Sequence, residues 1–347
     1  MAPHGRLLQS APPARGPPLT TSAGPASTVL PGAHVAAGEG DAAPAIRCRG
    51  LHKRFGETVA VKSLDLEVRR GECFGLLGPN GAGKTTTIEI LEGLTAPDGG
   101  EVELLGMRWD RQADAIRARL GVQLQESEFA DRATVEETLR LFRSFYPRGP
   151  SVAELLGFVQ LDEKRATQVR HLSGGQRQRL SVACALAGSP DVLFLDEPTT
   201  GLDPQSRRQL WDVCEAFRAG GGTILLTTHF MDEAEKLSDR IAILDRGEMI
   251  ALGTPRELIR SLGGEHVVEF ASTAAIPDDD LRAIPGVTRV GSRGALRQLT
   301  VGELHRSVPA LLELVHRAGG DLTALSTHQA TLDDVFLAMT GRELRDE

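Results

Sequence analysis

The sequence predicts an α/β fold, built on a mostly parallel sheet with helices on its faces, followed by a small α+β domain. From Ile46 to about Leu262, short apolar runs alternate with amphipathic helical stretches, which is the pattern of strands joined by crossover helices. Beyond that stretch the order changes to strand, helix, two strands, helix, strand and helix, as in a split βαβ sandwich. We therefore divide the chain into a tail at residues 1–44, an α/β domain at 45–263, an α+β domain at 264–341 and a second tail at 342–347.

The first 44 residues are expected to form a disordered tail. They hold ten Ala, eight Pro and six Gly, and they offer few large apolar side chains with which to offset the loss of backbone entropy on folding. Prolines also interrupt any apolar segment that would resemble a secretory signal. A wrongly assigned translation start is the alternative, in which case the tail is absent from the cell.

The composition disfavours several classes of protein. The 347 residues carry 39 Lys and Arg against 47 Asp and Glu, a net charge of −8, which is unlike a general nucleic-acid binder. The sequence has no run of about 18 apolar residues with which to cross a membrane, so a role there requires a partner. The four cysteines have neither CxxC spacing nor histidines at metal-ligand spacing, and we therefore predict reduced thiols.

The first motif of the α/β domain is a phosphate-binding loop. The apolar strand Cys73–Leu77 leads into a glycine-rich loop and then into the helical run Thr87–Leu94, which is the context that a GxxxxGK[ST] motif requires. Its glycines let backbone N–H groups surround phosphates, Lys84 adds charge for the β- and γ-phosphates, and the Thr85 hydroxyl suits Mg²⁺. A glycine-rich turn without a ligand is the alternative. The loop consists of Gly78, Pro79, Asn80, Gly81, Ala82, Gly83, Lys84, Thr85 and Thr86.

Two carboxylates and a histidine follow later strands. The apolar strand Val192–Asp196 ends in Asp196 and Glu197, at the edge where open α/β sheets place catalytic groups. We expect Asp196 to hold Mg²⁺ through water, and Glu197 to orient or deprotonate the attacking water. The strand Thr223–Thr228 delivers His229 to the same edge, where an imidazole can hydrogen-bond the γ-phosphate or the water. A solvated acidic turn and a structural histidine are the alternatives.

A second anion-binding helix start lies between the phosphate loop and the carboxylates. The run Leu172-Ser173-Gly174-Gly175-Gln176 precedes an amphipathic helix from Arg177 to Ala187. Ser173 can cap that helix, whose dipole favours an anion. One nucleotide does not need two such helix starts. We therefore infer that the second start serves a nucleotide held by another copy of the chain.

The remaining elements complete the two domains. We expect an apolar strand at Arg240–Leu244. The run 241–252 has two apolar pieces around a turn at 245–248, which is typical of a hairpin. Thr331 and Asp334 have the spacing of a capping box at the start of the last helix. In the small domain we expect strands at 266–271, at 322–327 and twice within 287–301, with helices at 278–284, 307–318 and 331–339.

Taken in order, these motifs resemble those of the ATP-binding cassette (ABC) ATPases over about residues 46–262. The resemblance implies a P-loop NTPase cassette with a mostly parallel core, an antiparallel β subdomain and an α-helical subdomain at about 126–171. It also implies ATP and Mg²⁺ as cofactors. In this family two copies pack head to tail. Each ATP then lies between the phosphate loop of one copy and the signature, the run at residues 172–176, of the other.

The resemblance also assigns roles to single residues. Gln125 becomes a ligand of Mg²⁺ or of the water, and Asp203, in Gly201-Leu202-Asp203, becomes a contact at the dimer interface. Phe55 matches the aromatic residue that stacks on adenine, and a core phenylalanine is the alternative. Within the signature, Ser173 and Gly175 would contact the γ-phosphate held by the other copy. The signature spans residues 172–176, and its expected nucleotide-binding residues are Ser173, Gly174, Gly175 and Gln176.

Two further segments point to a membrane partner. In transporters of this family the helical subdomain docks the cytoplasmic coupling helices of the membrane subunit. The segment 331–342 resembles the C-terminal domain of the daunorubicin-resistance type of drug exporter, which implies a separate transmembrane permease of the ABC-2 type and a drug-like, antibiotic or lipid-like cargo. The candidates for an apolar face on the helical subdomain, most of which we expect in the core, are Phe129, Val135, Leu139, Leu141, Phe142 and Phe145.

We therefore predict an ATPase that converts ATP and water to ADP and phosphate as the motor subunit of an exporter. Its membrane partner would hold it at the cytoplasmic face of the membrane, and we expect no nucleic acid as a ligand. A soluble ABC ATPase of DNA repair or translation is the alternative. DNA-repair forms carry a long coiled coil before the signature, for which this chain has no room between Lys84 and Leu172, and translation forms usually carry two cassettes. A regulatory module with little turnover is disfavoured by the presence of Glu197 and His229.

Overall fold

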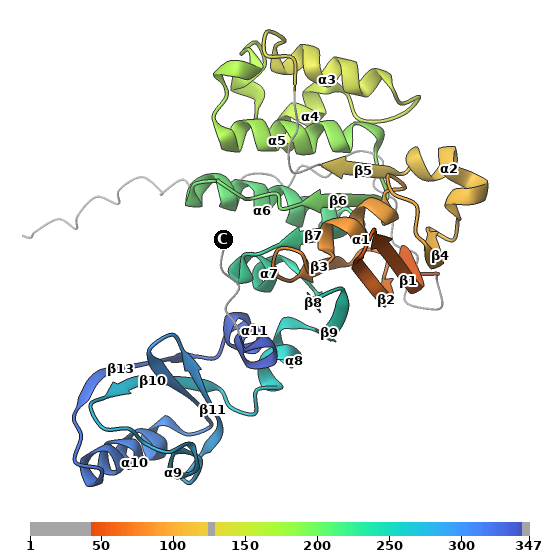
Figure 1. The fold of residues 1–347 in the computed structure, drawn as a ribbon. Helices are drawn as coiled ribbons and strands as arrows, with labels where there is room; N and C mark the ends of the chain where they lie inside the picture. The colour runs from red at the N-terminus through yellow and green to blue at the C-terminus, as the bar shows by residue number, and fades with distance from the viewer. Residues whose placement is uncertain (1–42, 124–128, 342–347) are drawn as a thin grey trace, which may run out of the picture.

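The computed structural model describes residues 43–123 and 129–341. These residues form a central sheet with flanking helices, a helical part above it and a smaller sheet with its own helices below it (Figure 1). Apart from residues 43 and 44, both predicted tails lie outside the described residues, as do Gln125 and residues 126–128.

The central sheet has six strands in the order β5-β6-β7-β3-β8-β9. Every neighbouring pair is parallel except β8 and β9, which form the predicted hairpin. All five residues of β3 and of β6 are buried, as expected for strands that are covered on both faces. The strands are β3 (Cys73–Leu77), β5 (Leu120–Gln123), β6 (Val192–Asp196), β7 (Thr223–Thr228), β8 (Arg240–Asp245) and β9 (Glu248–Gly253).

The register of the parallel strands brings three distant segments to one edge. Leu77, the last residue of β3, pairs with Thr228 at the end of β7. Asp196, the last residue of β6, pairs with Thr227. The phosphate loop, Glu197 and His229 each follow one of these strand ends, so the sheet places them side by side.

A second, antiparallel sheet in the order β2-β1-β4 covers one side of the core, as the family resemblance implied. Its strands are β1 (Ile46–Phe55), β2 (Thr58–Val68) and β4 (Gly99–Leu104). Buried side chains of these strands share one hydrophobic cluster with helix α1 (Lys84–Leu91) and with Phe74 and Phe194 of the central sheet. Helix α2 (Trp109–Arg117) follows β4. The antiparallel sheet, α1 and part of the central sheet therefore share one core.

The helical part consists of α3 (Val135–Ser144), α4 (Val152–Phe158) and α5 (Gly174–Ala185), with short 3₁₀ turns between them. Each of the three helices starts with a capping box, in which the side chains of the cap residue and of the third helical residue each accept a hydrogen bond from the other's backbone N–H. Of its six candidate apolar residues, four belong to the core or pack against it, and two do not. Val135 and Leu139 are buried, Phe129 and Phe142 pack partly buried against the core, and Leu141 and Phe145 are exposed.

Two further helices pack against the central sheet and against each other. They are α6 (Pro204–Ala219) and α7 (Met231–Leu237). Leu210, Val213 and Phe217 of α6 join Ile224 and Leu226 of β7 in one buried cluster. This packing fixes the segment that follows Glu197 and the segment that follows His229 on the same scaffold.

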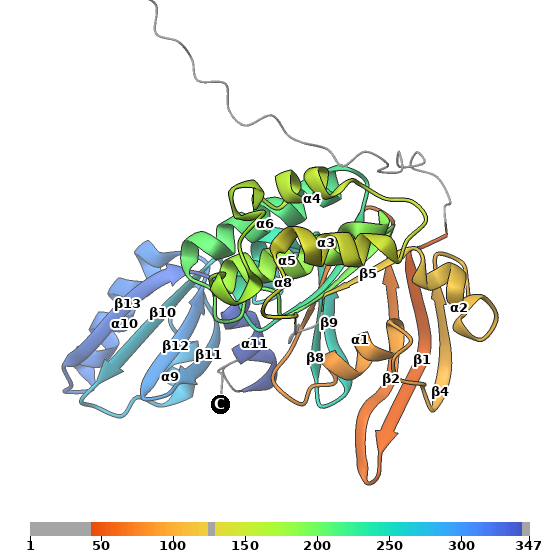
Figure 2. The same ribbon diagram turned by 90° about the horizontal axis from the view of Figure 1, so that it is seen from above.

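The small domain has the predicted order of elements. Its four strands pair antiparallel in the order β11-β12-β10-β13, which is the ferredoxin-like arrangement of a split βαβ unit. Helix α10 begins three residues before its predicted start. In Figures 1 and 2 this sheet and the β2-β1-β4 sheet lie on opposite sides of the molecule. The elements are β10 (His266–Ser272), α9 (Asp278–Arg282), β11 (Val287–Arg293), β12 (Leu296–Val301), α10 (Leu304–Arg317) and β13 (Leu322–Gln329).

The last helix, α11 (Leu332–Thr340), joins the small domain to the central part. Its buried Val335 and Phe336 share a cluster with Met231 of α7 and with residues of helix α8 (Pro255–Arg260). The predicted capping box is present, since Thr331 Oγ1 accepts a hydrogen bond from the Asp334 N–H. The buried Asp334 carboxylate also accepts a hydrogen bond of 2.9 Å from Gln298 Nε2 on β12.

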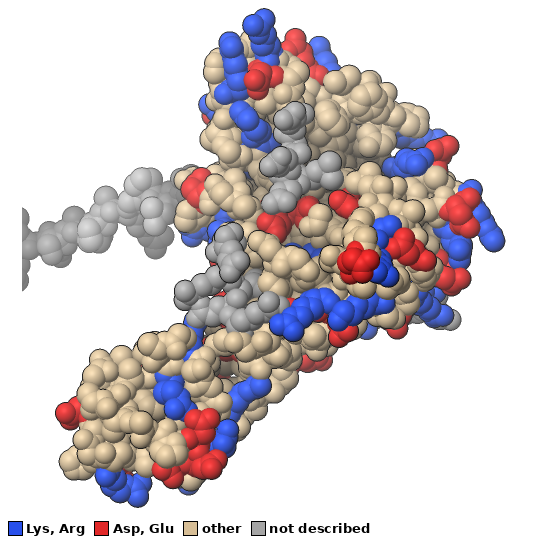
Figure 3. Space-filling view, viewed as in Figure 1, with Lys and Arg blue, Asp and Glu red and all other residues tan. Residues whose placement is uncertain are grey.

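Within residues 43–123 and 129–341, no helix combines the length and the apolar character needed to span a membrane. All four cysteines are buried and free, in agreement with the predicted reduced thiols. Lys and Arg are interspersed with Asp and Glu over the face drawn in Figure 3.

Candidate functional site

The phosphate loop has a backbone shape that requires glycine at two of its positions. Gly78 and Gly83 have φ values of +157° and +99°. A Cβ atom at Gly78 would lie 2.4 Å from the Leu244 carbonyl oxygen, and one at Gly83 would lie 2.4 Å from the Ala60 carbonyl oxygen. Both clashing atoms are backbone oxygens, which cannot move aside as the end of a flexible side chain can. A larger residue at either position would therefore displace the loop. The N-terminal end of α1 follows directly, with its positive dipole toward the loop.

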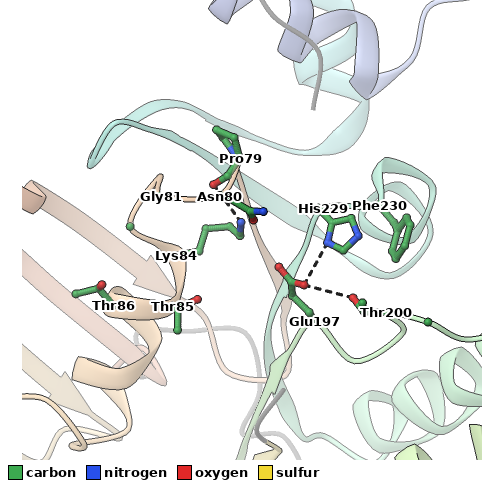
Figure 4. Close-up of a pocket in the computed structure, with 12 residues that line it drawn as sticks. Pro79, Asn80, Gly81, Lys84, Thr85, Thr86, Glu197, Thr200, His229 and Phe230 are labelled. Carbon is green, nitrogen blue, oxygen red and sulfur yellow. Dashed lines mark hydrogen bonds and ion pairs between the residues drawn. The ribbon is translucent and has the colours of Figure 1, made fainter. Parts of the chain in front are cut away.

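Lys84 reaches back across the mouth of the loop. Its Nζ donates hydrogen bonds of 2.7 Å to the Gly78 carbonyl and 3.3 Å to the Pro79 carbonyl, and Figure 4 shows the side chain beside Asn80. Burial lowers the pKa of the Lys84 ammonium, while Glu197 and Asp196 raise it. Among the described residues, the hydrogen-bond partners of this buried cation are carbonyl groups, which it can exchange for phosphate oxygens.

Asp196 ends strand β6 inside the protein. Its Oδ1 accepts a hydrogen bond of 2.5 Å from Thr227 Oγ1 on the neighbouring strand. Burial raises the pKa of the Asp196 carboxyl, the Thr227 hydrogen bond lowers it, and the adjacent Glu197 raises it further. A nearby cation would favour the ionised form of such a group.

Glu197 adopts a strained backbone conformation just beyond β6. Its φ is +46°, a value that costs free energy in a residue with a Cβ and that is found most often at functional sites. The Glu197 N–H donates to the Thr227 hydroxyl at 3.0 Å and to the Thr227 carbonyl at 3.2 Å. Thr227 therefore positions both carboxylate residues, a role that the sequence reasoning missed.

The Glu197 side chain turns toward His229. Its Oε2 lies 3.2 Å from His229 Nδ1 and accepts a hydrogen bond of 3.3 Å from Thr200 Oγ1 (Figure 4). The hydrogen bond from His229 holds the pKa of the Glu197 carboxyl below its ordinary value, although burial opposes this. The group is therefore an oriented carboxylate at neutral pH, as a general base for water requires.

Most of these groups line one cavity of about 530 Å³. Nine of the twelve predicted loop, carboxylate and histidine residues contribute to its wall, whereas Gly78, Ala82 and Asp196 do not. Sequence reasoning missed Thr200, Gly201 and Phe230, although each is close in sequence to a predicted residue. The lining residues are Pro79, Asn80, Gly81, Gly83, Lys84, Thr85, Thr86, Glu197, Thr200, Gly201, His229 and Phe230.

The cavity suits a nucleoside triphosphate with its metal ion. A glycine-bounded loop, a helix N-terminus and a buried ammonium are donors for phosphate oxygens. The Thr85 hydroxyl and the Asp196 carboxylate are oxygen ligands of the kind that Mg²⁺ takes. Gln125, the predicted ligand of Mg²⁺ or of the water, lies outside the described residues.

Phe55 lies at the end of β1 and is 50% exposed. The alternative of a core phenylalanine is therefore wrong. The Lys53 ammonium lies 5.1 Å from the centroid of the Phe55 ring, which leaves an open aromatic surface on the β1–β2 hairpin.

The signature lies apart from the cavity, at the start of α5. Ser173 caps the helix through a capping box with Gln176, and both Ser173 and Gly174 are exposed. A Cβ atom at Gly175 would lie 2.3 Å from Ser206 Oγ. Ser206 in turn donates a hydrogen bond of 2.6 Å to Asp203, the cap of α6. The two helix starts thus form one exposed surface.

Comparisons with known proteins place these motifs in a family. Residues 61–200 match the family model described as ABC transporter. The chain is 43% identical over 307 residues to the Nod factor export ATP-binding protein I of Cupriavidus pinatubonensis, covering 87% of this chain and 92% of the relative. It is 42% identical to the protein of the same name from Ralstonia nicotianae, covering 87% of this chain and 96% of that one.

Solved structures agree with the sequence relatives. An ATP-binding subunit of an ABC transporter matches with a TM-score of 0.57 and 30% identity, over 63% of this chain and 93% of that one. A dimeric ATP-binding cassette in a post-hydrolysis state with ADP and phosphate matches with a TM-score of 0.55 and 25% identity, over 60% and 98%. The fold predicted from the motifs is confirmed, and the chain belongs to the ATP-binding proteins of the ABC transporter family, which are ATPases.

Proposed function

We propose that the chain is the ATP-hydrolysing motor subunit of an ABC exporter and works as a head-to-tail dimer with separate transmembrane subunits. The observation that carries the proposal is the Glu197 carboxylate. It is held between His229 and Thr200 in the cavity that the phosphate loop also lines. The export function rests on the relatives, which are named as Nod factor export ATP-binding proteins.

Each residue of the cavity then has a task in hydrolysis. Lys84 and the N–H groups of the loop bind the β- and γ-phosphates, while Thr85 and Asp196 hold Mg²⁺. When bound, Mg²⁺ neutralises charge that develops on the phosphate oxygens. Glu197 accepts a proton from the attacking water, and His229 orients Glu197 through its Nδ1–H. With the second ring nitrogen also protonated, the Nε2–H would donate to the γ-phosphate or to the water.

The second half of each site comes from another copy. Ser173 and Gly174 are exposed at a helix N-terminus outside the cavity, so that they can bind a γ-phosphate held by a partner copy. Gly175 and Gln176 belong to the same helix start. Asp203, next to this surface, would contact the partner, and exposed Phe55 would stack on the adenine. The solved dimeric cassette with ADP and phosphate supports this arrangement.

A membrane subunit fits the helical part. Leu141 and Phe145 are 56% and 66% exposed there, and the Phe145 ring packs edge-on against Phe142 at a centroid distance of 6.0 Å. An exposed apolar group of this kind can receive a helix of a partner. We propose a permease of the ABC-2 type, which would hold the chain at the cytoplasmic face of the membrane.

The cargo is proposed from resemblance alone. The daunorubicin-type resemblance of the C-terminal segment favours a drug-like, antibiotic or lipid-like compound, and the relatives' names specify export of Nod factor. Both favour export over the alternative of a soluble ABC ATPase.

Glu197→Gln tests both the dimer and the membrane partner. The amide cannot accept the proton from water, so we expect ATP-bound closed dimers to accumulate, measured by size-exclusion chromatography in Mg-ATP. The same tagged variant, purified from detergent-solubilised native membranes, should retain a protein with several membrane helices. A monomer in saturating Mg-ATP contradicts the shared site. A dimer that retains only soluble proteins favours the soluble ATPase.

A further inference from the structure

Helices α6 and α7 are joined by a row of polar contacts. The three α6 residues are spaced four apart, so they lie on one face of that helix. They meet three residues of α7 at distances of 3.2, 3.1 and 3.0 Å. The pairs are Arg207 with Asp232, Trp211 with Glu233, and Glu215 with Lys236.

Both helices begin next to the catalytic residues. Helix α6 starts after the turn that follows Glu197, and α7 starts directly after His229 and Phe230. The Phe230 ring packs against the His229 ring at a centroid distance of 4.1 Å. The Arg207 guanidinium lies 4.3 Å from the centroid of the same Phe230 ring. The row of contacts thus begins at the histidine itself.

Only one of the three pairs includes a fully buried carboxylate. Glu233 is 0% exposed, and its Oε1 accepts a hydrogen bond of 3.1 Å from Trp211 Nε1. Burial raises the pKa of the Glu233 carboxyl, whereas the side chains of Thr228, Trp211 and Thr199 lower it. Thr228 immediately precedes His229, and Thr199 lies in the turn after Glu197.

This arrangement is costly if its only purpose is stability. Glu233 Oε2 and Thr199 Oγ1 are both buried atoms, and the Thr199 side chain is among the groups that lower the pKa of the Glu233 carboxyl. A buried acid is usually less stabilising than an apolar side chain of similar volume, even when polar side chains surround it. A carboxylate next to both catalytic loops is therefore better explained by a role in placing them.

We propose that Glu233 is a positioning residue for ATP hydrolysis. It holds the segment that carries His229 and the turn after Glu197 in one relative position, which sets the contact between His229 and Glu197. The inference rests on the roles given to these two residues in the proposed function. Glu233 is not among the residues that line the nucleotide cavity, so it acts through these two segments and through the contact between His229 and Glu197.

The test compares Glu233→Gln and Trp211→Phe with Glu215→Gln, a partly exposed member of the same row. Glutamine keeps an acceptor for Trp211 but loses the charge, and phenylalanine keeps the ring but loses the donor. We expect about a tenfold fall in kcat for the first two variants with little change in KM for ATP, and no change for the control. Thermal melting confirms that each variant is folded. A kcat within twofold of wild type in both variants overturns the proposal.

A double-mutant cycle separates positioning from general destabilisation. If Glu233 acts through His229, then Glu233→Gln should lower kcat no further in a His229→Ala background. Additive losses overturn the proposal. If His229→Ala alone hydrolyses ATP at the wild-type rate, the role of His229 in the proposed function is wrong. If His229→Ala is inactive while Glu233→Gln and Trp211→Phe have normal kcat, only the inference about Glu233 is contradicted.

Discussion

Replacing Thr227 by valine removes one hydroxyl that serves both acidic residues of the site. Thr227 Oγ1 donates to Asp196 Oδ1 at 2.5 Å and accepts from the Glu197 N–H at 3.0 Å. Thr227 is fully buried, and valine has nearly the same volume, so the change leaves no cavity. The Glu197 N–H keeps its second acceptor, the Thr227 carbonyl. The main loss is therefore the hydrogen bond to the buried Asp196 carboxylate.

A hydrogen bond to a charged group contributes about 1.5 to 3 kcal/mol. If this free energy holds Asp196 in its catalytic position, its loss should lower kcat by about ten- to a hundredfold. Thr223→Val is the matched control, because Thr223 lies on the same strand, is buried and accepts from the Gly71 N–H at 3.0 Å away from the cavity. Steady-state ATPase kinetics and thermal melting of both variants measure the effects. If Thr227→Val and Thr223→Val lose the same melting temperature and have the same kcat, the reasoning is refuted.

Three further predictions concern the cavity and the signature. Lys84→Ala should abolish hydrolysis, because no other ammonium lines the cavity among the described residues; normal phosphate release in a colorimetric assay would contradict the assignment. Ser173→Arg should stop hydrolysis while the monomer still binds a fluorescent ATP analogue, since Ser173 lies outside the cavity of its own chain; loss of binding would mean that the helix start acts within one chain. Contact with His229 lowers the pKa of Glu197 from 4.5, so the carboxylate stays ionised until the pH falls below that value. His229→Ala should raise this pKa and move the acid limb of the residual kcat profile to higher pH, and an unmoved limb would show that another group sets it.

Some parts of this protein follow from short stretches of sequence. The phosphate loop, the signature cap at Ser173 and the capping box at Thr331 each depend on residues within a few positions of one another. Their geometry is set by backbone conformations and hydrogen bonds that the local sequence already contains. The order of strands and helices in the small domain was likewise predictable, because its apolar periodicity changes from element to element.

Other features were settled only by long-range packing. Phe55 carries the same local pattern as a core residue, and only its place on the β1–β2 hairpin leaves it exposed. Leu141 and Phe145 are apolar and helical in spacing, yet they lie outside the core. Burial depends on which elements cover a side chain, and this is decided by segments far away in the sequence.

The sequence by itself determined the residue types of the site and the strand that delivers each of them. Only the tertiary structure decided how they meet. Asp196 and Glu197 reach Thr227 because β6 pairs with β7 in one register, and the pairing of β7 with β3 brings His229 beside the phosphate loop. Glu233 becomes a neighbour of both catalytic loops because α7 packs on α6. These contacts join residues that are distant in the chain, so their geometry depends on strand register and helix packing rather than on any local pattern.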